Sequence, residues 1–217
     1  MKKKVFGFLV LIGVVVVIVW GVAQKAYPVA TVDDDFIPAR QFQLAATAAQ
    51  TYYQKISEVY GEVSSTSDAI LIAETRAAAL QALIEDVVIA RELVRTRGEQ
   101  GLDTEVSARV ASALASSSMV TDESVGALFG LTVEQFKEIV LEPQARFEML
   151  ADTFTKKGEA IESWLQSELR RSRVSVLISD VAWTGDHVEL TGEQSYTAKV
   201  KEAFQLVASS TASSSVR

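Results

Sequence analysis

The chain has 217 residues, with 28 acidic against 21 basic side chains and a net charge of −7. It has no cysteine and one histidine, His187, which excludes disulfide frameworks, thiol chemistry and most metal or acid–base sites. Phosphate-loop, dinucleotide and zinc motifs are absent from the sequence, so we expect no cofactor.

The first distinctive stretch is residues 5–23, VFGFLVLIGVVVVIVWGVA, a run without charge that follows three lysines at 2–4. A helix of this length roughly matches the ~30 Å hydrocarbon core of a bilayer. Basic residues on its N-terminal side favour a cytoplasmic segment at 1–4 and a bulk of the chain outside the cytoplasm. The run therefore predicts a single-pass anchor in the cytoplasmic membrane.

A cleavable signal peptide is the alternative, because Gly21-Val22-Ala23 resembles a cleavage site. Signal peptides usually have a shorter apolar core of about 7–15 residues, so the length favours a retained segment. Beyond Ala23 the chain has 18 basic and 28 acidic residues, a net charge of −10. This excess argues against binding nucleic acid or anionic lipid.

A spacer at 24–28 leads into a short strand at 29–32 and an acidic turn at 33–35. Phe36-Ile37-Pro38 is expected to lead into a helix, with Pro38 in its first turn, where a missing N–H costs little. This helix should run to about Tyr60. Its apolar residues recur at spacings of three and four on one face: Phe42, Ala45, Ala49, Tyr52, Ile56 and Val59.

A longer helix is predicted from Asp68 to Arg97, with Gly98 as its C-terminal stop. Shorter helices are predicted at 104–117 and 122–129. The apolar stripe of the long helix is expected to consist of Leu80, Leu83, Ile84, Val87, Ala90 and Val94.

The clearest periodicity begins after Thr132 and Gln135, which form a capping box. Pro143 interrupts the hydrogen-bond ladder and predicts a kink. The stripe keeps its phase across the proline, which favours one bent helix ending before Gly158. Its members are Phe136, Val140, Pro143, Phe147, Leu150 and Phe154.

A further amphipathic helix is predicted at 159–171, with Ile161, Trp164, Leu165 and Leu169 inward. Alternation predicts a strand at 174–178. The remaining segments form an extension at 180–207 and a disordered tail: a hairpin of 181–183 with 188–190, a helix around Tyr196 to Val207, and a Ser/Thr-rich end at 208–217.

The order of these segments resembles the N-terminal chaperone domain of the SurA/PrsA family of exported foldases, over residues 29–179. The matching stretches are VATVDDDFIPARQF (29–42), ALIEDVVIARELVRTRG (82–98), FGLTVEQFKEIVLEPQARFEMLADTF (129–154) and IESWLQSELRRSRVSVLI (161–178). The resemblance implies a mostly helical clamp, in which the first strand pairs with the strand at 174–178. It also implies binding of unfolded exported polypeptides through apolar surfaces.

The sequence departs from the family where many members carry a parvulin-type prolyl isomerase domain. Only Thr155 to Ala160 separate the kinked helix from the next one, which is too short for such a domain. Parvulin catalysis also uses paired histidines, and this chain has only His187. We therefore expect no isomerase activity and no catalytic residues.

Candidate client contacts are large apolar residues that lie off the main stripes: Tyr53, Tyr60, Met119, Phe129 and Met149. A chaperone needs such surface exposed, and methionine adapts to varied partners. Asp33 to Asp35 lacks the ligand spacing of a calcium loop and predicts a solvated turn. Thr184 to His187 predicts a hairpin turn, because no nucleophile motif accompanies the histidine.

The sequence thus predicts a mainly α-helical protein with a transmembrane helix, a chaperone-like helical domain, a small strand pair and a C-terminal hairpin. The preferred hypothesis is a membrane-anchored chaperone that binds unfolded or nascent exported polypeptides. A structural or adaptor module that binds one folded envelope partner is the alternative.

Overall fold

The computed structural model describes residues 27–60, 68–117 and 119–191. The apolar run at 5–23, the helix expected around Tyr196 and the tail at 208–217 lie outside these residues. The described part is mainly helical with small antiparallel sheets, as predicted. None of the helices within it combines the length and apolarity needed to span a bilayer.

Three strands form the first sheet: β1 (Pro28–Val32), β2 (Asp35–Pro38) and β3 (Val174–Val176). Their order is β2-β1-β3, and both pairs are antiparallel. The pairing of the first strand with the 174–178 region is thus confirmed, although the strand ends at Val176. Residues 36–38 form a strand and do not begin the helix, because Asp33 and Asp34 form a tight turn that returns the chain along β1.

Arg91 of helix α3 (Asp68–Arg97) fixes this turn. Its guanidinium donates to the carboxylates of Asp33 and Asp35 and, at 2.8 Å, to the carbonyl of Val32. Asp33 has a positive φ of 51°, which aspartate tolerates better than most residues. The Asp33 carboxylate also accepts the backbone N–H of Arg173, 2.9 Å away. This hydrogen bond, with the nearby Arg91 guanidinium, lowers the pKa of Asp33.

Asp33→Asn should reduce the pH dependence of stability. Since the folded-state pKa of Asp33 is lowered, the ionised carboxylate stabilises the fold above its ordinary pKa near 3.8, and this contribution is lost progressively as the pH falls through the folded-state pKa. We expect the variant to be about 1 kcal/mol less stable at pH 7 and the gap to be smaller at pH 3. Urea unfolding at pH 7, 5 and 3 measures the difference, and a gap that does not shrink between pH 5 and pH 3 would contradict the assignment.

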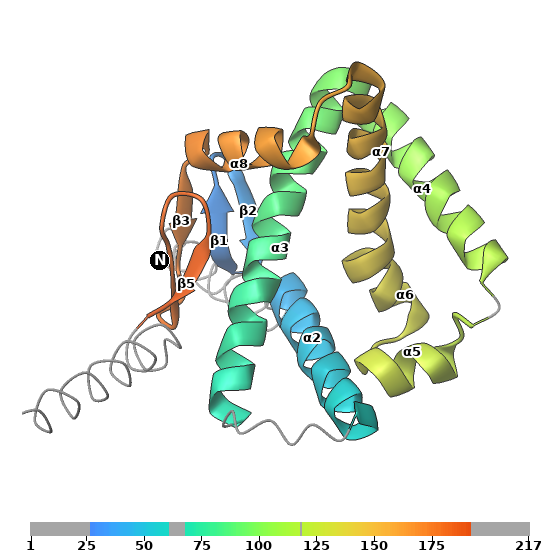
Figure 1. The fold of residues 1–217 in the computed structure, drawn as a ribbon, viewed down its shortest axis with the longest axis vertical. Coiled ribbons are helices and arrows are strands. Elements are labelled where there is room, and N and C mark those ends of the chain that lie inside the picture. The colour runs from blue at the N-terminus through green and yellow to red at the C-terminus, as the bar shows by residue number, and fades with distance from the viewer. Residues whose placement is uncertain (1–26, 61–67, 118, 192–217) are drawn as a thin grey trace, which may run out of the picture.

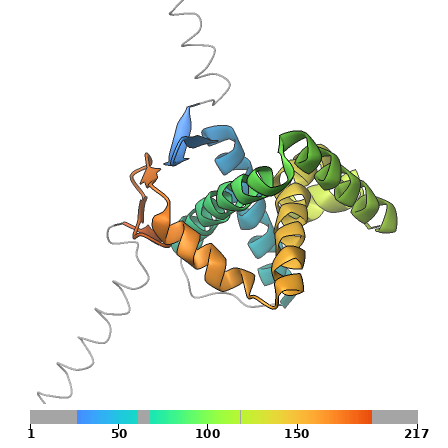
Figure 2. The same cartoon turned by 90° about the horizontal axis from the view of Figure 1, so that it is seen from above.

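Helices α2 (Ala39–Tyr60) and α3 (Asp68–Arg97) have the predicted ends at Tyr60, Asp68 and Arg97. Helix α3 crosses the whole molecule. The first sheet and strand β5 (Val188–Leu190) lie on one side of it, and helix α7 (Glu142–Lys157) lies on the other (Figures 1 and 2). Its buried residues therefore extend around more than one face. The first core joins the sheet to the two helices through Val29, Ala30, Val32, Ile37, Phe42, Leu80, Leu83 and Ile84.

The second core lies where α3 meets α4 (Glu99–Ser116), α7 (Glu142–Lys157) and the start of α8 (Ile161–Arg171). Helix α4 begins five residues earlier than position 104, because Gly98 adopts a positive φ of 75° and lets the chain reverse directly after α3. The buried residues are Ile89, Leu93, Leu102, Val106, Val110, Ala145, Met149, Leu150, Phe154 and Ile161.

Helices α5 (Asp122–Phe129) and α6 (Val133–Phe136) are bounded by local signals. Gly130 ends α5 in the left-handed conformation, as predicted. The predicted capping box is also present: the Thr132 hydroxyl accepts the Gln135 N–H at 3.2 Å, and Gln135 accepts the Thr132 N–H at 3.0 Å.

A π-helical turn, η1 (Lys137–Leu141), connects α6 to α7. The N–H of Glu142 reaches the carbonyl of Lys137, five residues back, which widens the turn just before Pro143. The path is one continuous helix, as predicted, and Phe136, Leu150 and Phe154 of the predicted stripe are buried. Phe147 is the exception: it is 39% exposed, whereas Ala145 and Met149 of the same helix are buried.

Helix α8 buries Ile161 and Leu169 and half-buries the other two predicted inward residues. Strands β4 (Val181–Trp183) and β5 (Val188–Leu190) form the predicted hairpin. It packs on α3, where Gln81 accepts the Val188 N–H at 2.9 Å and Arg76 contacts Asp180 at 2.7 Å.

Candidate functional site

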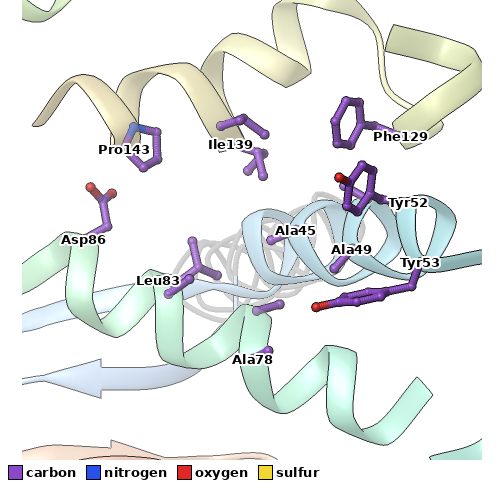
Figure 3. Close-up of a pocket in the computed structure, with 14 residues that line it drawn as sticks. Ala45, Ala49, Tyr52, Tyr53, Ala78, Leu83, Asp86, Phe129, Ile139 and Pro143 are labelled. Carbon is purple, nitrogen blue, oxygen red and sulfur yellow. The ribbon is translucent and has the colours of Figure 1, made fainter. Parts of the chain in front are cut away.

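An open apolar groove lies between α2, α3, the end of α5 and the π-helical turn. Its volume is about 300 Å³. The close-up in Figure 3 shows side chains from these elements facing a common space. We call this the α2–α3 groove; it is lined by Ala45, Ala48, Ala49, Tyr52, Tyr53, Ala78, Ala79, Ala82, Leu83, Asp86, Phe129, Ile139, Val140 and Pro143.

Small side chains create the space. Helix α2 contributes three alanines and α3 another three, so much of the groove wall on both helices consists of short side chains. Leu83, which is only 5% exposed, connects the groove to the core below it. An alanine-lined helix pair leaves apolar surface accessible without weakening either helix, since alanine has the highest helix propensity.

Aromatic rings form one end of the groove (Figure 3). Tyr52 stacks on Phe129 with ring centroids 5.3 Å apart and an interplanar angle of 6°. Tyr53 meets Tyr52 edge-on, with ring centroids 6.2 Å apart. Phe136, which does not line the groove, has its ring centroid 5.0 Å from that of Phe129. Such aromatic contacts add about 0.5–1.5 kcal/mol each beyond their buried area, so this end is preorganised.

Gly130 ends α5 beside Thr51 of α2. Its φ of 66° is unfavourable for residues other than glycine, so the chain can turn directly after Phe129. A Cβ placed on Gly130 would lie 3.4 Å from the hydroxyl oxygen of Thr51, an ordinary contact distance.

The opposite end of the groove is polar and is marked by Asp86 (Figure 3). Arg146 donates from Nε and Nη2 to the two carboxylate oxygens of Asp86, both at 2.8 Å. The two side chains are only 12% and 16% exposed. Glu142 lies 3.8 Å from the same guanidinium. Burial raises the pKa of Glu142, and the charges of Glu138 and Asp86 act in the same direction.

The π-helical turn supplies the wall that faces α2 and α3. Ile139 and Val140 come from within it, and Pro143 follows one turn later. Pro143 has no N–H to donate, and in a regular helix its ring would clash with the carbonyl four residues back. The widened turn avoids this clash. Such turns occur frequently at functional sites, which agrees with this position.

Two of the five predicted contact residues line the groove. Tyr53 is 50% exposed and Phe129 is half-buried at the aromatic end. Met119 is 79% exposed but is not among the lining residues. The side chain of Tyr60 lies outside the described part. Met149 is 0% exposed, so its expected place on the surface is wrong.

The remaining lining residues were missed by sequence reasoning. The alanines of α2 and α3 gave no signal, because small apolar residues on a helix are as typical of a core as of a groove. Pro143 was noticed as a helix kink but not as part of a site, and Asp86 could have been noticed as a carboxylate among the apolar residues of α3.

Residues Thr184 to His187 connect the two strands of the hairpin, as expected. His187 contacts Asp186 through Nδ1 at 2.6 Å and Glu189 through Nε2 at 2.9 Å. The hydrogen bond with Asp186 is the main cause of the raised pKa of His187. Within the described ranges, no cluster of three acidic or histidine side chains is arranged to hold a metal ion.

Comparison of the chain with protein-family models, curated proteins and solved structures finds no match.

Proposed function

We propose that this protein is a non-enzymatic chaperone, anchored in the membrane through residues 5–23, that binds unfolded exported polypeptides in the α2–α3 groove. One observation carries the proposal: an apolar groove with a preorganised aromatic end stays open where the first core meets a smaller cluster of Ala48, Val125, Leu131 and Phe136. A folded monomer rarely leaves such a surface without a use in binding.

The dimensions of the groove suit one or two apolar side chains of an extended chain. A volume of about 300 Å³ is at the small end of ligand sites, so the affinity for any one segment should be modest. Weak binding suits a chaperone that must release its clients. Tethering at the membrane would raise the local concentration of grooves near emerging chains, which compensates for the weak binding.

Ala78→Gln should weaken binding of unfolded chains about tenfold or more. Ala78 lines the groove and is exposed on α3, so a longer polar side chain should fill the space without disturbing the core. Excluding one apolar client side chain removes about 1.5–3 kcal/mol of burial. The full chain in a non-ionic detergent is mixed with a chemically denatured protein, and aggregation is followed by light scattering.

Ala111→Gln is the matched control, because Ala111 is an exposed alanine on α4 that does not line the groove. It should protect the denatured protein as well as the wild type does. Equal protection by the Ala78 and Ala111 variants would place binding elsewhere. Recovery of one folded partner in fixed stoichiometry, with no protection of denatured chains, would favour the adaptor alternative.

A further inference from the structure

The two ends of the α2–α3 groove differ in chemistry, and the difference gives a bound chain a direction. Tyr52, Tyr53 and Phe129 surround one end, whereas Asp86 lies at the other (Figure 3). An uncharged apolar ligand would use only the first end. A ligand that uses both must carry a polar group next to its apolar side chain.

Negative charge exceeds positive charge at the Asp86 end. Arg146 is the guanidinium partner of both Asp86, at 2.8 Å, and Glu142, at 3.8 Å. Glu138 is paired with Arg40 at 3.2 Å. Three carboxylates thus share two guanidinium groups, which leaves one negative charge without compensation.

Glu142 is the carboxylate with the weakest compensation. Two donors of Arg146 are already engaged with Asp86, and its third nitrogen is too far from Glu142 for a hydrogen bond. Half-burial makes its charged form more costly than that of a fully solvated carboxylate. An additional cation beside Glu142 would relieve this cost.

We propose that the groove selects extended segments in which a lysine or arginine lies two residues from an aromatic or large aliphatic side chain. Alternate side chains of an extended chain point to the same side, so the apolar group can occupy the aromatic end while the cation approaches Glu142. The net charge of −10 beyond Ala23 would attract such segments from a distance. The inference rests on the proposed function and names its substrate class.

Three fluorescent peptides test the selection. They are identical, with one phenylalanine, except that the residue two positions away is Lys, Gln or Glu. Fluorescence anisotropy with the full chain in a non-ionic detergent should give the tightest binding for Lys, about threefold weaker binding for Gln and weaker again for Glu, because partly exposed ion pairs have modest energies. The preference should decrease with added salt.

Glu142→Gln should bring the Lys and Gln peptides to equal affinity and leave Gln-peptide binding unchanged. Glu142 does not line the groove itself but contacts Arg146, the partner of the lining residue Asp86. Glu148→Gln is the control, because Glu148 is an exposed residue of the same helix whose partners are Arg109 and Gln144. It should keep the threefold preference. Thermal melting of both variants checks that they fold.

The outcomes separate the two proposals. Binding of all three peptides with equal affinity would overturn the charge selection and leave the proposed function intact. A preference for Lys that persists in Glu142→Gln would overturn the role of this carboxylate. Failure of every peptide to bind would overturn the proposed function itself. Concentration-dependent self-association that Ala78→Gln abolishes would identify a second copy as the occupant and overturn both.

Discussion

Met149→Ala should lower the free energy of unfolding by about 2–5 kcal/mol, the range found when large buried side chains are truncated. Met149 is 0% exposed and lies in the second core, among residues of α3, α4 and α7 such as Leu93 and Val106. Because close-packed neighbours relax only partly, the truncation leaves a cavity and loses contacts on every side. Urea unfolding of the two proteins at one pH measures the difference.

Two further variants test which side of α7 is buried. Met149→Leu conserves volume and should cost less than about 1.5 kcal/mol. Phe147→Ala should cost less than Met149→Ala, because Phe147 is 39% exposed. The apolar spacing of the sequence predicts the opposite ranking, with Phe147 buried and Met149 on the surface. A larger loss for Phe147→Ala than for Met149→Ala would contradict the placement of these two side chains.

Asp86→Ala should destabilise the protein by about 3 kcal/mol. The variant would leave Arg146, which is 16% exposed, without the carboxylate that accepts two of its donors at 2.8 Å. Removing one partner of a largely buried ion pair typically costs about 3–5 kcal/mol, and the remaining exposure of Arg146 favours the lower value. Chemical unfolding measures the loss.

The double variant Asp86→Leu with Arg146→Met should recover most of this stability, since two apolar side chains of similar size leave no unpaired charge. It should keep the preference for basic peptides, because it removes one negative and one positive charge and leaves Glu142 in place. If the double variant is as unstable as Asp86→Ala, the loss comes from packing and the ion pair is not its cause.

The sequence allowed the elements with local signals to be predicted well. Thr132 with Gln135, and Gly130 after Phe129, mark helix ends through side-chain caps and backbone freedom that depend only on neighbours. The pairing of β1 with β3 came from a resemblance, because nothing in the spacing of two short strands specifies their contact.

The remaining features depend on tertiary structure. The π-helical turn changes the hydrogen-bond partner of Glu142 by a single residue, and apolar periodicity does not encode such a change. Val94 was expected inward on α3 but is 39% exposed, whereas Ile89 and Leu93 are buried against α4 and α7. A helix covered by several elements has no single stripe, so the periodicity identified the helix but not its contacts.

The groove could be predicted only in part, for the same reason. Tyr53 and Phe129 stood out as large residues off the stripes. The alanines that form the space did not, because the groove arises where α2 and α3 both carry small side chains at facing positions. Which positions face each other is known only once the two helices are packed together.

The pairing of β1 with β3 also affects the timing of folding. Residues 30 and 176 are partners in the sheet, and Asp33 bonds to the backbone of Arg173, 140 positions later. During synthesis from the N-terminus, β1 therefore has no β3 partner until almost the whole described part has been made. Contacts this distant in sequence slow folding. A protein proposed to bind unfolded chains is thus itself incompletely folded for much of its own synthesis.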